Sequence, residues 1–165
     1  MVVSAHDVAR ELRNAVPGDP GDVKIHKLLY YCQGWHLART GEPLFAEPIE
    51  AWLNGPVVAE LWRDEKRAHR PSPAALALDA ESRHTVEIVV ARYGDLTGKQ
   101  LIRLTHDEPP WRDASEREDA FVSATISVGA LIRHFEVIHE VYGFGPMRMT
   151  PERLRIIDEA KARTA

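Results

Sequence analysis

A dense run of apolar and aromatic residues, KLLYYCQGWH, occupies positions 27–36 and dictates how the chain can be organised. Apolar residues recur at helical spacing through and beside this run, and they predict a helix capped by Asp22 and reaching about Arg39. Gly41 follows where a left-handed C-terminal cap would be needed. Because the helix is so rich in apolar residues, we expect it to be the central element of the domain.

Length and composition indicate one domain with a sizeable core. The chain has 165 residues, of which 44% are hydrophobic. It has no apolar run of the 18 or more residues that cross a bilayer and no basic-then-apolar leader pattern, so we expect a cytoplasmic protein with no membrane partner. Cys32 is the only cysteine, which excludes an intramolecular disulfide and a cysteine-based zinc site.

The charge balance disfavours a nucleic-acid partner. The formal net charge is −4 and the sequence pI is about 6.1, whereas nucleic-acid-binding domains usually carry a basic face. The densest charged run, residues 63–67, mixes both signs and reads as a solvated helix face.

Capping residues and periodic apolar positions predict further helices, so the expected fold is a mainly α, compact helical bundle. Proline pairs and glycines supply the stops between them. One predicted helix runs from the capping box Ser4/Asp7 to about Val16, and another from Pro56, as its first residue, to about Ala68. Three more run from Asp79 to Gly94, from the capping box Thr97/Gln100 to just before Pro109, and from Ser127 to Gly143.

A small β-hairpin or pair of short strands is expected near residues 44–53. Pro43 and Pro48 flank short apolar pieces there, and Ile49, Ala51 and Leu53 alternate with their neighbours. Asn54 and Gly55 then provide a turn. Residues 70–73, Arg-Pro-Ser-Pro, predict a loop that serves as a lid or as a plain connector.

The end of the chain is expected to be separate from the domain. We assign residues 1–143 to the domain, 144–150 to a linker and 151–165 to a C-terminal helix or tail bearing Leu154, Ile157 and Ala160 on one stripe. So short a helix is marginal alone. It would dock on the domain, make a homodimer, or reach a partner.

No metal or cofactor site is expected. The eight histidines, at positions 6, 26, 36, 69, 84, 106, 134 and 139, include no pair at the i, i+4 spacing of a helical zinc motif. Phosphate-binding and dinucleotide-binding glycine motifs are also missing from the sequence.

Two groups of residues could be interpreted as catalytic, but a structural role explains each of them better, so the chain is not expected to be an enzyme. Cys32 and His36 share a helix face and would pair a thiol with a base, but a small buried residue is the simpler interpretation of Cys32. His106 with Asp107 and Glu108 would make a general base and an acid. Adjacent residues seldom face each other, however, and no nucleophile elbow accompanies them.

The four tryptophans suggest a surface for another macromolecule, since aromatic residues dominate interface energetics. Trp35 is expected in the core. His106 and Trp111 are expected to satisfy a helix end and to pack on the core, with an exposed recognition surface as the alternative. The candidate partner-binding residues are Trp52, Asn54, Gly55, Pro56, Trp62, His106 and Trp111.

Several ordered motifs resemble the signature of the Panacea antitoxin domain, the family of SocA-like and phage-associated GepA-like proteins. The resemblance covers roughly residues 4–143, and it departs at Cys32, where the family commonly has alanine, and after Gly143. The motifs that carry it are KLLYYCQGWH at 27–36, Pro43-Leu-Phe45, Ile49-Glu-Ala-Trp52, Gly55-Pro-Val57 and Leu104-Thr-His106 through Pro110-Trp111.

The resemblance implies the antitoxin of a type II toxin–antitoxin pair, which binds and neutralises a toxin encoded beside it, without cofactor or catalytic residue. We expect it to act by steric occlusion. The resemblance also leaves two alternatives open. The protein would be an adaptor that delivers the toxin to a cellular protease, or a phage-associated or mobile-element-associated interaction protein without an antitoxin role. The family-motif residues expected to be structural are Lys27, Leu28, Tyr30, Tyr31, Gln33, Gly34, Trp35 and His36.

Overall fold

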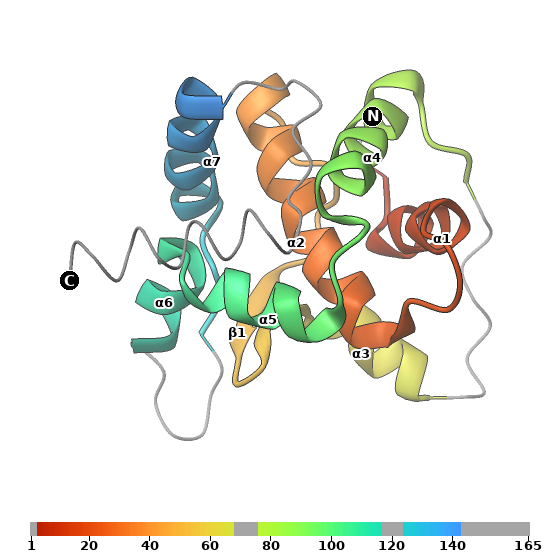
Figure 1. Cartoon of the computed structure of the whole chain (residues 1–165), viewed down its shortest axis with the longest axis horizontal. Helices are drawn as coiled ribbons and strands as arrows, with labels where there is room; N and C mark the ends of the chain where they lie inside the picture. The colour runs from red at the N-terminus through yellow and green to blue at the C-terminus, as the bar shows by residue number, and fades with distance from the viewer. Residues whose placement is uncertain (1–2, 68–75, 117–123, 143–165) are drawn as a thin grey trace.

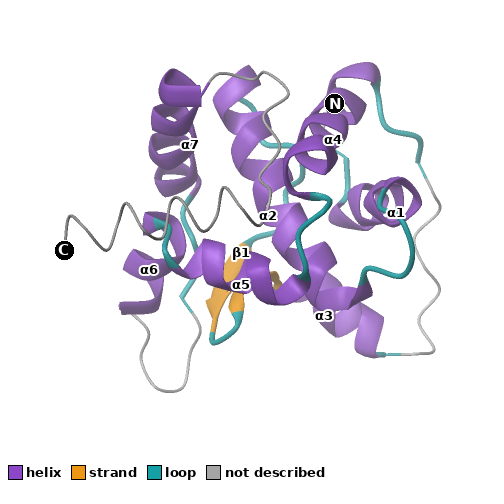
Figure 2. Cartoon of the chain, viewed as in Figure 1, coloured by secondary structure: helices purple, strands orange, loops and turns teal. Residues whose placement is uncertain are grey.

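The computed structural model describes residues 3–67, 76–116 and 124–142, and in this part the fold is mainly α, as predicted (Figure 1). A single antiparallel hairpin accompanies the helices (Figure 2). The elements are α1 (Ala5–Ala15), α2 (Gly21–Thr40), β1 (Ile49–Trp52), β2 (Gly55–Val58), α3 (Ala59–Lys66), α4 (Ala80–Tyr93), α5 (Gly98–His106), α6 (Pro109–Glu116) and α7 (Val128–Tyr142).

Helix α2 is the central element, as the apolar run predicts. Every residue from Ile25 to Leu37 is buried. Helices α1, α4, α5 and α7 and strand β2 all pack against it, with α7 on one side and α1 and α4 on the other (Figure 1). A helix buried on all sides needs apolar residues on all sides, which explains the continuous run in the sequence.

Side-chain caps fix the starts of several helices where the sequence places them. Ser4 accepts a hydrogen bond from the Asp7 amide at 3.1 Å, and Asp79 accepts one from Ser82 at 2.8 Å. Thr97 and Gln100 form a reciprocal capping box. Each cap satisfies amides that would otherwise lack a partner at the helix end. One predicted cap is wrong: α2 begins at Gly21 after Pro20, and Asp22 lies in its first turn.

The hairpin begins within the predicted range of residues 44–53, but its second strand lies beyond that range. Its strands pair Ile49 with Val58 and Trp52 with Gly55, so Pro56 belongs to β2 and does not begin a helix. Helix α3 starts at Ala59 instead. Proline is accepted in β2 because its ring nitrogen, which has no hydrogen to donate, faces away from β1 in this register.

The proline pair after α5 opens a helix rather than a loop. Sequence reasoning treats Pro109-Pro110 only as the end of α5, but α6 starts at Pro109 and carries Trp111 in its first turn. Proline fits the first positions of a helix because their amides have no partner within the helix.

Helix α7 closes the core over α2. Its Phe135 ring meets the rings of Tyr30, Tyr31 and Trp35 edge-on, with centroids 5.5 to 6.0 Å apart. A Cβ atom at Gly34 would overlap the Phe135 ring, so only glycine allows this approach of the two helices. Ser127 caps α7 as predicted, by accepting the Ala130 amide at 3.1 Å.

Several expectations concern residues outside the described part: the loop at 70–73, Gly143 as the end of α7, the linker 144–150 and the tail 151–165. Among the described helices, none is both long and apolar enough to cross a membrane.

Candidate functional site

The hairpin presents a two-residue tip to solvent. Leu53 is 85% exposed, the largest exposure among the large apolar residues that the structure describes, and Asn54 beside it is also exposed. Gly55 follows with φ of 101°, a conformation that other residues rarely adopt. Gly55 and Pro56 themselves are buried, so these two predicted contact residues shape the tip and do not form its surface.

Both edges of the hairpin are already occupied. On the outer edge of β2, Lys27 donates to the Pro56 carbonyl at 2.9 Å and the Val58 amide donates to His26 Nδ1 at 3.2 Å. On the far side of β1, the Ala51 amide donates to the Ala124 carbonyl at 2.8 Å. A partner therefore cannot bind by adding a strand to this hairpin, and contact must come through side chains.

Four aromatic residues, Trp52, Trp62, His106 and Trp111, meet beneath the tip, and we call them the aromatic cluster. Trp111 donates its indole N–H to the Trp52 carbonyl at 2.8 Å. The Trp52 and Trp62 rings meet at 5.9 Å, and His106 stacks on Trp111 at 3.9 Å. All four side chains are half-buried. The structure thus brings together candidates from β1, α3, α5 and α6, and places Trp111 on a helix.

Lys27 lies beneath this assembly as a buried cation. It is 1% exposed, and burial lowers the pKa of its ammonium group to about 8. Burial also lowers the pKa of His106, and the nearby charge of Lys27 acts in the same direction. The amine satisfies the Pro56 carbonyl and thereby ties the hairpin to the central helix.

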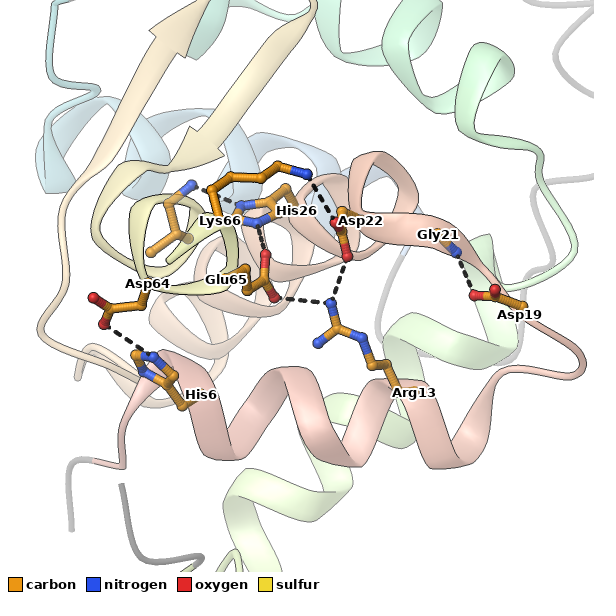
Figure 3. Close-up of polar contacts among 10 residues, drawn as sticks. His6, Arg13, Asp19, Gly21, Asp22, His26, Asp64, Glu65 and Lys66 are labelled. Carbon is orange, nitrogen blue, oxygen red and sulfur yellow. Dashed lines mark hydrogen bonds and ion pairs between the residues drawn. The ribbon is translucent and has the colours of Figure 1, made fainter. Parts of the chain in front are cut away.

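Helix α3, which carries Trp62, is fixed to α1 and α2 by a network of charged side chains (Figure 3). Arg13 donates to Asp22 at 3.0 Å and to Glu65 at 2.8 Å. His26 Nε2 lies 3.1 Å from Glu65. Since His26 Nδ1 accepts from Val58, Nε2 must carry the proton and donate it. The same ring meets Trp62 at 5.3 Å.

The charges in this network stabilise its carboxylates. Burial alone would raise the pKa of Glu65, but hydrogen bonds from His26 and Arg13, together with the charge of Arg13, lower it overall. The pKa of Asp22 is likewise lowered, because Lys66 and Arg13 outweigh the effect of burial. Helices α1 and α3 make one further contact, in which His6 Nε2 lies 3.2 Å from Asp64 Oδ2.

The alternative interpretation of His106 and Glu108 as a general base with its acid has no geometric support. Both carboxylate oxygens of Glu108 are engaged elsewhere: one accepts from the Tyr31 hydroxyl at 2.6 Å, and the other lies 3.0 Å from His134 on α7. His106 stacks on Trp111 instead. Glu108 therefore joins α2, α6 and α7 as a structural contact.

The pairing of Cys32 with His36 also has no access to a substrate. Cys32 is fully buried, and burial raises the pKa of its thiol. His36 is held by Thr85, whose hydroxyl is 2.7 Å from Nδ1. In the described part of the chain, no three histidine, cysteine, aspartate or glutamate side chains are grouped so as to hold a metal ion.

The remaining family-motif side chains lie in the interior. Gln33 binds the backbone of Leu44 and Phe45, accepting at 2.8 Å from the first amide and donating at 2.8 Å to the second carbonyl. The indole of Trp35 donates to the Tyr93 hydroxyl at 3.0 Å. Leu28, Tyr30 and Tyr31 are fully buried, and the prediction that Trp35 lies in the core is confirmed.

Sequence reasoning missed Leu53, the most exposed apolar residue of the hairpin. It assigns Leu53 to the alternating inward face of a strand with Ile49 and Ala51. The signal against that assignment is its position directly before Asn54-Gly55, where a two-residue loop includes the leucine.

Comparison with known families agrees with these motifs. The family model described as "Antitoxin SocA-like, Panacea domain" matches residues 25–112, which are 88 of the 165 residues. The match runs from α2 through the hairpin to Trp111 and so contains the whole aromatic cluster, although it is shorter than the expected 4–143. Neither a curated protein nor a solved structure matches the chain.

Proposed function

Since the chain belongs to the family of SocA-like antitoxins with a Panacea domain, we propose that it neutralises a protein toxin, encoded by a neighbouring gene, by direct contact through the hairpin tip. The family name supports the antitoxin role. The contact surface is inferred from the geometry of the hairpin. The mechanism is steric occlusion in the cytoplasm, without catalysis or cofactor.

One observation carries the choice of surface: an exposed leucine stands on a rigid support. Leu53 is 85% exposed, yet the strands beside it are tied to α2 and to α6 through Lys27 and Trp111. A residue whose backbone is held in place before binding loses less conformational entropy when its side chain inserts into a pocket, which favours a binding anchor. The partly exposed aromatic cluster would surround this anchor.

The test is a growth assay in which the adjacent gene is induced alone and then together with this protein. We expect the neighbour to arrest growth, co-expression to restore it, and the two proteins to co-elute. A neighbour that is harmless, or that still arrests growth in the presence of this protein, would contradict the antitoxin role.

The surface is tested by Leu53→Asp. An anchor residue typically contributes at least about 2 kcal/mol to binding, so the variant should bind the toxin at least about 30-fold more weakly and lose protection. The matched control is Leu76→Asp, since Leu76 is 61% exposed and lies before α4, where its amide donates to Asp7 on α1. Equal losses in both variants, or none in Leu53→Asp, would exclude the tip as the contact.

The same cells separate occlusion from delivery to a protease. Under occlusion the toxin's half-life is unchanged or longer when this protein is present. Under delivery it becomes shorter, and the protein acts as an adaptor.

A further inference from the structure

Helices α6 and α7 leave a cavity of about 240 Å³ between them. Its wall is largely apolar, and charged side chains stand at its opening: Asp113 is 62% exposed and Arg133 is exposed as well. The lining residues are Pro109, Pro110, Asp113, Ala130, Arg133, His134 and Val137.

The cavity lies along a second face of α7. Leu131 and Phe135 point into the core and are buried, whereas Ala130, His134 and Val137 follow one another at i, i+4 and i+7 on the cavity side. Val137 is 59% exposed, although it belongs to this stripe. Helix α7 therefore has apolar residues on two faces, and the described residues cover only one of them.

We propose that residues 151–165 of the same chain fill this cavity as a helix antiparallel to α7. The segment has Leu154, Ile157 and Ala160 at i, i+3 and i+6, which gives one apolar stripe. Seven of its other twelve positions are charged, with both signs represented, and the cavity opening offers Arg133 and Asp113 as complementary charges.

The covalent connection makes this occupant the favoured one. Helix α7 ends at Tyr142, and residues 143–150 can span at most about 26 Å when extended. The distance back along α7 from Tyr142 to Ala130 is about 18 Å, and a 15-residue helix is about 22 Å long. The segment can thus reach the whole cavity, and its tether gives it a high effective concentration there.

Docking in the cavity would also stabilise the helix that we propose for residues 151–165. A helix of this length in water is marginal unless an apolar face is packed. Packing against Pro109 and Pro110 would in turn support α6, which carries Trp111 of the aromatic cluster. The inference itself does not depend on the antitoxin role.

Cysteine cross-linking in the full-length chain tests the proposal. With Cys32→Ala as background, the introduced cysteines are the only thiols in the protein. The antiparallel arrangement predicts that Val137→Cys lies near Leu154→Cys, and Ala130→Cys near Ala160→Cys. The control combines Leu154→Cys with Glu87→Cys, because Glu87 is 66% exposed on α4, which lies across α2 from α7 (Figure 1).

A short bismaleimide should link both predicted pairs within one chain and leave the control pair unlinked, as seen by intact mass and by peptide mapping. Links formed only between two chains would show that a second copy fills the cavity, and would overturn the proposal. Equal linking of the control pair, or no link in either predicted pair, would also overturn it.

Hydrogen exchange gives an independent readout without added cysteines. Val137→Asp places a charge in the cavity and should accelerate amide exchange in residues 151–165 by roughly tenfold. The core of α2 should keep its protection, which shows that the variant is folded. If exchange in 151–165 is the same in both proteins, the segment does not dock there.

Discussion

At the scale of single residues, Lys27 shows how the interior supports the candidate surface. A lysine that is 1% exposed is unfavourable in its charged form, and here its amine has the Pro56 carbonyl as acceptor. Its long side chain carries the amine from α2 to the edge of β2, where it ties the two elements together.

The lowered pKa of Lys27 predicts a pH dependence of stability. The unfolded chain keeps a lysine pKa near 10.5, whereas the folded value is about 8, so between these values the unfolded state binds more protons and stability rises with pH. From about pH 8 to about pH 10, the free energy of unfolding should gain roughly 2 kcal/mol from this group.

Urea unfolding of the wild type and of Lys27→Met across this range measures the effect as the difference between the two curves. The exposed Lys99→Met on α5 is the control and should follow the wild type. Parallel curves for wild type and Lys27→Met would contradict the prediction.

Gly55 is required by both its backbone and its surroundings. Its φ is 101°, and a Cβ atom would come within 2.8 Å of Lys27 Cε and 2.9 Å of Thr105 Oγ1. Gly55→Ala should therefore destabilise the protein by about 2 to 4 kcal/mol, since strain and overpacking add.

Gly41→Ala separates the two causes. Gly41 has φ of 77°, but nothing lies within 4 Å of an added Cβ, so only the backbone cost of about 1 kcal/mol remains. Thermal unfolding of both variants gives the comparison. Equal losses would mean that close packing around Gly55 contributes nothing.

At the scale of elements, the charged network between α1, α2 and α3 positions Trp62. Glu65 receives hydrogen bonds from Arg13 and His26, and its side chain is only 17% exposed. Glu65→Gln removes the charge, and the expected loss is about 1 to 2 kcal/mol at neutral pH.

This loss should depend on pH with a definite sign. The pKa of Glu65 is lowered in the folded state, so its contribution is complete above the unfolded value of 4.5 and declines as the pH falls below it. The wild type and Glu65→Gln should therefore converge in acid. Glu87→Gln, at a site 66% exposed, should match the wild type throughout. Chemical unfolding at several pH values measures these differences, and a gap that persists in acid would refute the assignment.

Most helix boundaries could be predicted from sequence because local chemistry determines them. Ser4, Asp79 and the Thr97/Gln100 pair cap their helices through residues a few positions away. Strand β2 and helix α6 were not predicted because Pro56 and Pro109 are each compatible with two local structures. Tertiary context decided between them: β2 is held by Lys27, and α6 packs against α7.

At the scale of the whole molecule, one core connects all the described elements. Residues from α1, α2, the hairpin, α3, α4, α5, α6 and α7 belong to a single buried cluster. Unfolding should therefore be cooperative, with coincident transitions by tryptophan fluorescence and by far-ultraviolet circular dichroism.

Trp35→Phe sharpens this experiment. The remaining tryptophans, at 52, 62 and 111, then report on the aromatic cluster alone, while circular dichroism reports on the helices. A fluorescence transition at clearly lower urea than the helical one would show that the hairpin unfolds separately, against the prediction.

The site was only partly predictable at this scale. The sequence marks Trp52, Trp62, His106 and Trp111 as unusual, but not that four elements bring them together, since their contacts span up to 59 positions. It also cannot show which residue of the turn is exposed. The exposure of each turn residue depends on the strand register, which places Leu53 in the loop and Gly55 in the strand.

The two closed edges of the hairpin have an evolutionary consequence. Because Leu53 and Asn54 add nothing to the core, while Lys27, Gly55 and Trp111 hold the strands from within, the tip can mutate freely without cost to the scaffold. Selection can then act on recognition separately from folding. Under the proposed function, a lineage with this architecture can follow a changing toxin, or acquire a new one, by exchanging two solvent-facing side chains.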